Sequence, residues 1–342
     1  MIRRIKNAST ATCTLPIYMG FLMTEPNSIS CTQLAETYNI SHDSVNRFLE
    51  REDYTPHDLY QEAIQHIDNN KLIVSIDDTV LDKPYSQHMD LVSYFWSGKH
   101  HRSVKGINLI TLYATDQNGQ NIPINFRIYD KSEGKTKNDY FMDMLSEVLS
   151  WGAKIQFITG DSWYSSTGNL KTIRKYGIRF MFGIDCNRKV SPEKGQWFQL
   201  RLLPNFHQGQ VVWLKDFGFV QLFKTQLKEQ QRFYIVHQDE DDLLSFEGFH
   251  ELHSSHWKIE QYHRVIKQVC HIEKFQVRRS KLILNHIFSA LMAYVEIQKN
   301  QFERIFENVY RWQKKLFRPM IKNFIDDFIL DKNHLLPQRI YK

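Results

Sequence analysis

An acid and a column of cations share one helical stripe in the segment HWKIEQYHRVIKQ, residues 256–268. In a helix, offsets of three, four and seven residues place His263, Arg264 and Lys267 on the same face as Glu260. Such a stripe is often a solvated row of i,i+4 pairs, each contributing only tenths of a kcal/mol. It is also the arrangement in which a carboxylate binds a metal ion while neighbouring cations hold an anionic polymer.

Two further acids end predicted buried strands earlier in the chain. Asp78 closes the apolar run KLIVSIDDT (71–79), and Asp161 closes KIQFITGD (154–161). If these strands are parallel neighbours, both aspartates lie at one edge of the sheet, and a helix packed across that edge can deliver Glu260. An aspartate at a strand end is common because loops begin there, whereas the order strand-Asp, strand-Asp, helix-Glu is much rarer.

Three carboxylates in one cleft repel one another unless cations neutralise them. Mg²⁺ is the natural cation, because it prefers oxygen ligands and keeps positions for substrate phosphates. Two such ions would activate a water or a 3′-hydroxyl and stabilise the leaving oxygen of a phosphoryl transfer. On the first strand, Asp77 and Asp78 point to opposite faces, so only one of them is expected to share this cleft.

The elements around these acids are typical of an α/β domain. Apolar runs predict strands at 71–79, 107–116, 122–130, 154–161 and 178–185, and helical spacing predicts helices at 137–152 and 166–176. Asn118-Gly119 predicts a hairpin between the second and third strands. Residues 195–245 are strand-like and interrupt this pattern, and helix is expected again from about 250 to about 330.

The N-terminal region is predicted to be helical, with two short helices and a tight turn in SCTQLAETYNISHDSVNRFLE (30–50). The turn contains Asn39, and Ser41 is the predicted N-cap of the second helix. This is the helix-turn-helix pattern, in which the residues facing DNA would be Ser41, His42, Ser44 and Arg47. The alternative is a helical hairpin that only packs against the rest of the protein.

The bulk composition is that of a globular protein with a mildly basic surface. The 342 residues carry a formal net charge of +6, which permits nucleic-acid binding without proving it. The four cysteines are scattered and form no CxxC pair, so neither a structural zinc site of that type nor a disulfide framework is expected. The longest apolar stretch near the N-terminus, LPIYMGFLM, is far shorter than a membrane span. We therefore expect an intracellular, soluble protein.

Three motifs give the sequence a family resemblance over roughly residues 70–300. IDDT, TGDSWYSS and HWKIEQYHRVIK resemble the acid motifs of DDE-type transposases of bacterial insertion sequences, in the insertion-sequence-four type. The resemblance implies an α/β fold with an RNase H-like mixed sheet, helices on both faces and a β-strand insertion at about 190–248. It also implies a helical DNA-end-binding domain with the helix-turn-helix (1–68), the catalytic domain (69–300), and a helical tail for a dimer or DNA contact (301–342).

The same resemblance assigns roles to the acids. The family places its first catalytic aspartate directly before a threonine, which implies Asp78 and leaves Asp77 beside the site. Together with Asp161 and Glu260, it would bind two Mg²⁺ ions, with Mn²⁺ tolerated.

The family's third motif reads Tyr, two residues, Arg, three residues, Glu, six residues, Lys. Glu260 and Lys267 fit that spacing, whereas His253 and His256 stand at the Tyr and Arg positions. Those two positions contact phosphate in the family, although histidine is mostly neutral at pH 7. HELHSSH also fits a cluster of three histidines for zinc, but no cysteine or acid at a familiar spacing supports that alternative.

The densest basic run of the chain surrounds and follows the third acid, and its members are Lys258, Arg264, Lys267, Lys274, Arg278, Arg279 and Lys281. We expect them to contact DNA phosphates, with a solvated helix face as the alternative. In the resembled group, an aromatic residue of the insertion stacks on a flipped base. The candidates here are Trp197, Trp213 and Phe217, each of which is otherwise expected in the core.

The expected protein is therefore a cut-and-paste DNA transposase whose partners are the inverted-repeat ends of its element and target DNA. A homodimer is expected because a synapse holds two ends, and the expected location is the bacterial cytoplasm, at the nucleoid, without a membrane contact. Two alternatives remain: a metal-dependent RNase H-like nuclease that needs no specific ends, and a helix-turn-helix DNA-binding regulator.

Overall fold

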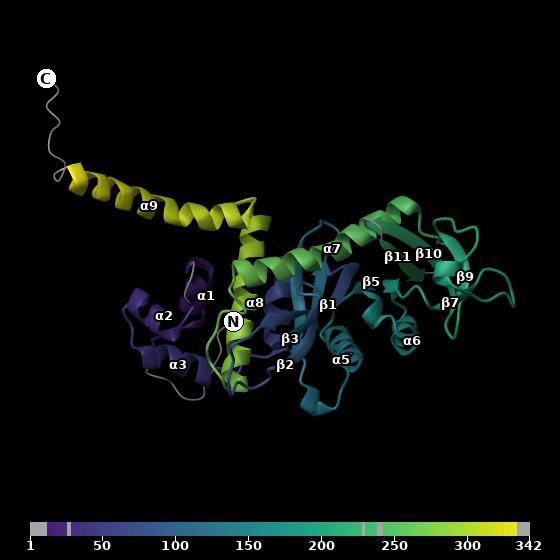
Figure 1. Ribbon diagram of the computed structural model, residues 1–342, viewed down its shortest axis with the longest axis horizontal. Helices are drawn as coiled ribbons and strands as arrows, with labels where there is room; N and C mark the ends of the chain where they lie inside the picture. Colours follow the sequence, from purple (N-terminus) through teal and green to yellow (C-terminus); the bar gives the residue numbers. More distant parts are fainter. Residues whose placement is uncertain (1–11, 26–28, 228–229, 238–241, 334–342) are drawn as a thin grey trace, which may run out of the picture.

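The computed structural model describes residues 12–25, 29–227, 230–237 and 242–333 (Figure 1). The predicted N-terminal domain and C-terminal tail therefore extend, at 1–11 and 334–342, outside the described residues. At the centre lies a mixed sheet whose strands follow the predicted runs: β1 (Leu72–Asp82), β3 (Arg102–Thr115), β4 (Asn121–Ile128), β5 (Ile155–Gly160) and β6 (Arg179–Ile184).

The strand order around β1 matches the expected RNase H-like class. β3 runs antiparallel to β1, with Asp78 opposite Ile110, and β4 continues the antiparallel meander as the predicted hairpin. β5 runs parallel to β1, with Ile76 opposite Gly160, and β6 is parallel to β5. A short strand that the sequence analysis did not predict, β2 (Ser93–Ser97), pairs with the first part of β3. The carboxyl end of β5 therefore lies beside the middle of β1, next to Asp77.

Helices cover both faces of the sheet. α5 (Lys137–Ser150) and α6 (Thr167–Lys175) lie on one face, whereas the long α7 (Phe246–Gln268) crosses the other face over β1 and β5 (Figure 1). α5 begins at the N-cap Thr136 with a full capping box, and the predicted stop at Gly152 is confirmed by its left-handed φ of 97°.

The prediction of unbroken helix from about 250 to about 330 is wrong. Residues 269–279 leave α7 as an irregular segment before α8 (Ser280–Phe302), and a second break precedes α9 (Val309–Asn333). In the first break, His271 takes a left-handed φ of 53° and the carbonyl of Arg278 accepts a hydrogen bond from the Asp90 amide. The end of the basic run is therefore held by tertiary contacts and not by a helix.

The strand-like block extends the central sheet. Its strands are β7 (Lys189–Ser191), β8 (Phe198–Gln199), β9 (Gln210–Leu214), β10 (Gly218–Leu227) and β11 (Gln230–His237). β11 pairs antiparallel with β6, placing Phe233 opposite Ile184, so the block continues the sheet beyond β6. Of its candidate aromatics, Phe217 is buried as expected, whereas Trp197 and Trp213 are 46% and 43% exposed.

The N-terminal region consists of α1 (Leu15–Thr24), α2 (Cys31–Tyr38), α3 (His42–Arg51) and α4 (Pro56–Ala63). The predicted helical pair is confirmed: Asn39 takes a left-handed φ of 54° in the turn, and the Ser41 side chain caps α3. These helices share one core with α8, where the Tyr18 hydroxyl lies 2.8 Å from His286 Nδ1. α9 projects from the far end of α8, away from the sheet (Figure 1).

Candidate active site

Asp77 faces α7 at the middle of β1. Glu260 and His263 lie three residues apart on α7, so one helical face presents both to the sheet. The ligand atoms of Asp77, Glu260 and His263 all lie within 4.8 Å of one another. His263 Nδ1 is 3.7 Å from Asp77 Oδ2, which is too long for a hydrogen bond. Strand β1 and helix α7 thus bring two carboxylates and an imidazole together.

The charge at this cluster is poorly compensated. The pKa of Asp77 is raised well above its usual value, chiefly by burial and then by the negative charges of Asp161, Asp78 and Glu260. Burial also lowers the pKa of His263 to about 3, so its imidazole is neutral. Its Nε2 is buried and has no hydrogen-bond partner among the described residues, which costs about 1–3 kcal/mol. Two carboxylates and a neutral nitrogen are a donor set that fits a divalent cation.

Asp161 follows β5 and stands one residue beyond the pairing of Ile76 with Gly160. It caps a one-turn 3₁₀ helix, accepting the amide of Trp163 at Oδ1 over 2.9 Å. Its pKa is raised to about 6, chiefly by loss of hydration and then by the charge of Asp78. On β6, a Cβ at Gly183 would lie 3.0 Å from the amide nitrogen of Ser162, so glycine there allows the Asp161 turn to pack close.

Asp78 points to the opposite face, where three donors bind its carboxylate. Oδ2 accepts hydrogen bonds from Asn108 Nδ2 at 2.6 Å and from Lys137 Nζ at 2.7 Å, and Oδ1 accepts one from the Tyr164 hydroxyl at 2.9 Å. Asp78, and not Asp77, was the predicted first acid of the site. The structure instead groups Asp77 with Glu260, because the two neighbours alternate across the sheet and α7 covers the Asp77 face.

The predicted cations of α7 have different surroundings. Lys267 Nζ donates to the carbonyl of Val80 on β1 at 2.6 Å, and burial lowers the pKa of this lysine. Lys258 Nζ donates to the carbonyl of Gly119 in the β3–β4 hairpin at 3.1 Å. Arg264 is exposed and lines a cavity between α7 and the start of α9. Of these three side chains, only Arg264 is freely presented at the surface.

The two histidines at the Tyr and Arg positions are bound within the protein. His253 Nε2 lies 3.0 Å from the Tyr234 hydroxyl, and His256 Nδ1 lies 3.2 Å from Thr159 Oγ1. Burial lowers the pKa of both, to about 4 for His256, so neither carries a positive charge at pH 7. Among the described residues, His250, His253 and His256 do not lie close enough together to form a metal-binding group.

The predicted DNA-facing residues outside α7 are divided between the surface and the interior. Ser44 is 2% exposed and its hydroxyl accepts the amide of Cys13, so the prediction that it faces DNA is wrong. It lies on the face of α3 that packs with Val45 and Phe48. Arg47 is exposed on α3, and Arg278 and Arg279 are exposed after α7. Arg279 pairs with Glu50 of α3 at 2.7 Å.

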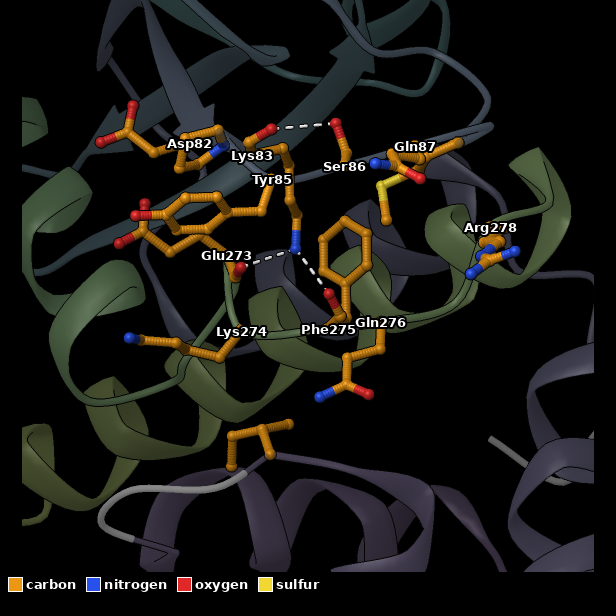
Figure 2. Close-up of a pocket in the computed structure, with 13 residues that line it drawn as sticks. Asp82, Lys83, Tyr85, Ser86, Gln87, Glu273, Lys274, Phe275, Gln276 and Arg278 are labelled. Atoms are coloured by element: carbon orange, nitrogen blue, oxygen red, sulfur yellow. Dashed lines mark hydrogen bonds between the residues drawn. The ribbon is translucent and has the colours of Figure 1, made fainter.

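A cavity beside the end of β1 contains a lysine clamp (Figure 2). Lys83 Nζ donates to the carbonyls of Glu273 and Phe275, each at 2.7 Å, and lies 3.3 Å from the centroid of the Phe275 ring. Burial lowers the pKa of Lys83 to about 7. The clamp ties β1 to the segment that follows α7, which helps to fix α7 and Glu260 relative to Asp77.

Sequence reasoning missed three residues beside the acids. His263 was placed on the acidic stripe but was not considered as a ligand. Tyr164 stands in the quoted motif TGDSWYSS, three residues after the second acid, so its position could have marked it. Lys137 opens α5, and nothing in the sequence near it indicates a contact with β1. Its Nζ also lies 5.6 Å from the centroid of the exposed Trp163 ring.

Comparison with known proteins agrees with this arrangement. A family model described as "Transposase DDE domain" matches residues 68–295, well over half of the chain. No curated protein matches the chain. Among solved structures, an Argonaute of Marinitoga piezophila in complex with guide RNA and target DNA matches at a TM-score of 0.23 and 10% sequence identity. That match covers 68% of this chain and 33% of the Argonaute chain, and it is too weak to support any argument.

The helices of the described residues include none with the length and apolar character needed to cross a membrane. The mixed sheet is consistent with the α/β fold of the family whose model matches the chain. The chain belongs to the transposase DDE-domain family, whose members act on DNA as nucleases and transposases.

Proposed function

We propose that this transposase excises a bacterial insertion sequence by cutting DNA at its inverted-repeat ends, and joins the freed 3′ ends to target DNA. The reaction is of the cut-and-paste kind, and two protomers hold two ends in a synapse. The observation that carries this proposal is the meeting of Asp77 with Glu260, beside Asp161 at the end of the neighbouring parallel strand.

The metal ligands in this proposal are Asp77, Asp161 and Glu260. Asp77 takes the place of the expected Asp78, because the Asp78 carboxylate already binds three donors. Bound Mg²⁺ ions would make a water or 3′-hydroxyl nucleophilic and balance charge on the leaving oxygen. Tyr164 and Lys137 hold Asp78 in place on the other face of β1.

Exposed cations are the proposed DNA contacts. Arg264 on α7, Arg47 on α3 and Arg278 in the following segment have their side chains at the surface. Each phosphate contact releases counterions, so affinity should fall steeply as salt is raised. His253 and His256 contribute to the fold of α7 and not as cations, because their ring nitrogens lie against protein hydroxyls.

The test is metal-dependent cleavage of a DNA fragment that carries the flanking inverted repeats. The proposal predicts cleavage at the repeat ends by the wild-type protein, and no cleavage by Asp161→Asn, which should still bind the ends. Equal cleavage of DNA without repeats would instead identify a general nuclease. Specific binding with no cleavage under any divalent ion would identify a DNA-binding regulator.

A further inference from the structure

A nitrogen donor stands among the carboxylates of the proposed metal site. His263 is 6% exposed, and its side chain lies between α7 and β1 with Nδ1 3.7 Å from Asp77 Oδ2. Ligands that share a divalent ion at about 2.0–2.2 Å lie roughly 3 Å apart, so only a small approach brings both atoms onto one ion. The same separation is too long for a direct hydrogen bond.

The hydrogen bonding of His263 is also incomplete. Its Nε2 has no partner among the described residues. Its Nδ1 faces the Asp77 carboxylate at a distance too long for a hydrogen bond. Most buried histidines of structural type have a partner on at least one nitrogen. On the same helix, His256 is such a case, since its Nδ1 lies 3.2 Å from Thr159 Oγ1. The two histidines therefore differ: His256 has a hydrogen-bond partner on Nδ1, whereas neither ring nitrogen of His263 has one among the described residues.

We propose that His263 is a ligand of the ion held by Asp77 and Glu260, and that its nitrogen biases this site towards Mn²⁺ and other first-row transition ions over Mg²⁺. This inference rests on the proposed function. Imidazole nitrogen is a poor partner for Mg²⁺, which prefers oxygen ligands, and a good one for transition ions. The ion preference of the site is then set by His263, and the carboxylates alone would favour Mg²⁺.

The experiment is pulsed electron paramagnetic resonance of Mn²⁺ bound to the full-length protein. Wild-type protein should show ¹⁴N modulation from a directly bound imidazole, and labelling of its histidines with ¹⁵N should replace that signal with ¹⁵N modulation. In His263→Gln, Mn²⁺ should remain bound with the nitrogen signal lost. Mn²⁺ affinity should fall about 10-fold to 100-fold while Mg²⁺ affinity changes less.

His256→Gln is the matched control, because it removes a second buried histidine from the same helix and should keep the nitrogen signal. Bound Mn²⁺ without nitrogen modulation in the wild-type protein would overturn the inference and leave the proposed function standing. Persistence of the signal in His263→Gln would also overturn it. Failure of the wild-type protein to bind Mn²⁺ would overturn the inference, and failure to bind Mg²⁺ as well would overturn both. The labelled wild-type protein keeps the test valid if His263→Gln does not fold.

Discussion

Asp77 and Asp78 are adjacent on one strand and equally exposed, at 16% of each side chain, yet their surroundings are opposite. The Asp78 carboxylate binds a lysine, an amide and a phenol. Asp77 accepts the backbone amide of Asp78 at Oδ1, and otherwise faces further acids and a neutral imidazole. Burial alone does not distinguish the two. The difference supports the proposal that Asp77, and not Asp78, binds the cation.

The largest expected effect is on DNA cleavage. Asp77→Asn should reduce metal-dependent cleavage by at least about 1,000-fold, because removal of a metal ligand loses several kcal/mol of transition-state stabilisation. Asp78→Asn should reduce it by about tenfold or less once the fraction of folded protein is accounted for. Single-turnover cleavage of an end fragment measures both. Equal losses in the two variants would show that the faces of β1 are not separate in function.

Metal binding should vary with pH, because the acids of the site must be ionised to bind a cation. Asp161 has a raised pKa of about 6, and its protonated form does not bind a cation. The pKa of Asp77 is also raised, so Mn²⁺ affinity should fall by at least about tenfold per unit as the pH drops below 6, because each protonated ligand must lose its proton.

Asp78→Asn sharpens this second prediction. It removes a like charge near Asp161, so the pKa of Asp161 should fall and the loss of affinity should move to lower pH. Calorimetric titration with Mn²⁺ between pH 5 and pH 7.5 measures the shift. A profile that moves to higher pH in this variant would contradict the electrostatic assignment.

A smaller effect is expected at the lysine clamp. Lys83→Met should lower the free energy of unfolding by about 1–3 kcal/mol, because two buried carbonyls lose their donor. Since the clamp fixes the end of α7, it should also weaken Mn²⁺ binding on the Asp77 side. Chemical denaturation and calorimetry report the two effects. A stable variant with unchanged Mn²⁺ affinity would show that α7 is positioned without the clamp.

Much of the fold followed from local pattern. The apolar runs that end at Asp78 and Asp161 are strands because both faces of the central sheet are covered, which favours continuous apolar sequence. Ser41 and Gly152 marked helix ends in the sequence, through a side-chain cap and a left-handed backbone conformation. The break after Gln268 was missed because tertiary contacts, including those made by Lys83 and Asp90, hold it away from helix.

The site was predictable in its elements but not in its details. Asp78 and Asp161 could be assigned to strands because each closes an apolar run. Glu260 could be assigned to a helix because its segment has helical spacing. The choice between Asp77 and Asp78 depends on which face α7 covers, and periodicity along one strand carries no such information. The contact of Lys137 with Asp78 joins residues 59 apart in sequence, and the burial of Ser44 depends on how α3 packs against the segment at Cys13.

The central claim is that Asp77, and not Asp78, is the acid reserved for a metal ion, and unfolding free energies test it most directly. In metal-free buffer at pH 8, Asp77→Asn should stabilise the protein, because the raised pKa of Asp77 means that its ionised form opposes folding above the unfolded pKa. Asp78→Asn should destabilise it by about 2–3 kcal/mol, since Lys137 loses its buried partner. Added Mn²⁺ should then stabilise wild type and Asp78→Asn but not Asp77→Asn. Stabilisation of Asp77→Asn by Mn²⁺, together with its loss in Asp78→Asn, would contradict the account.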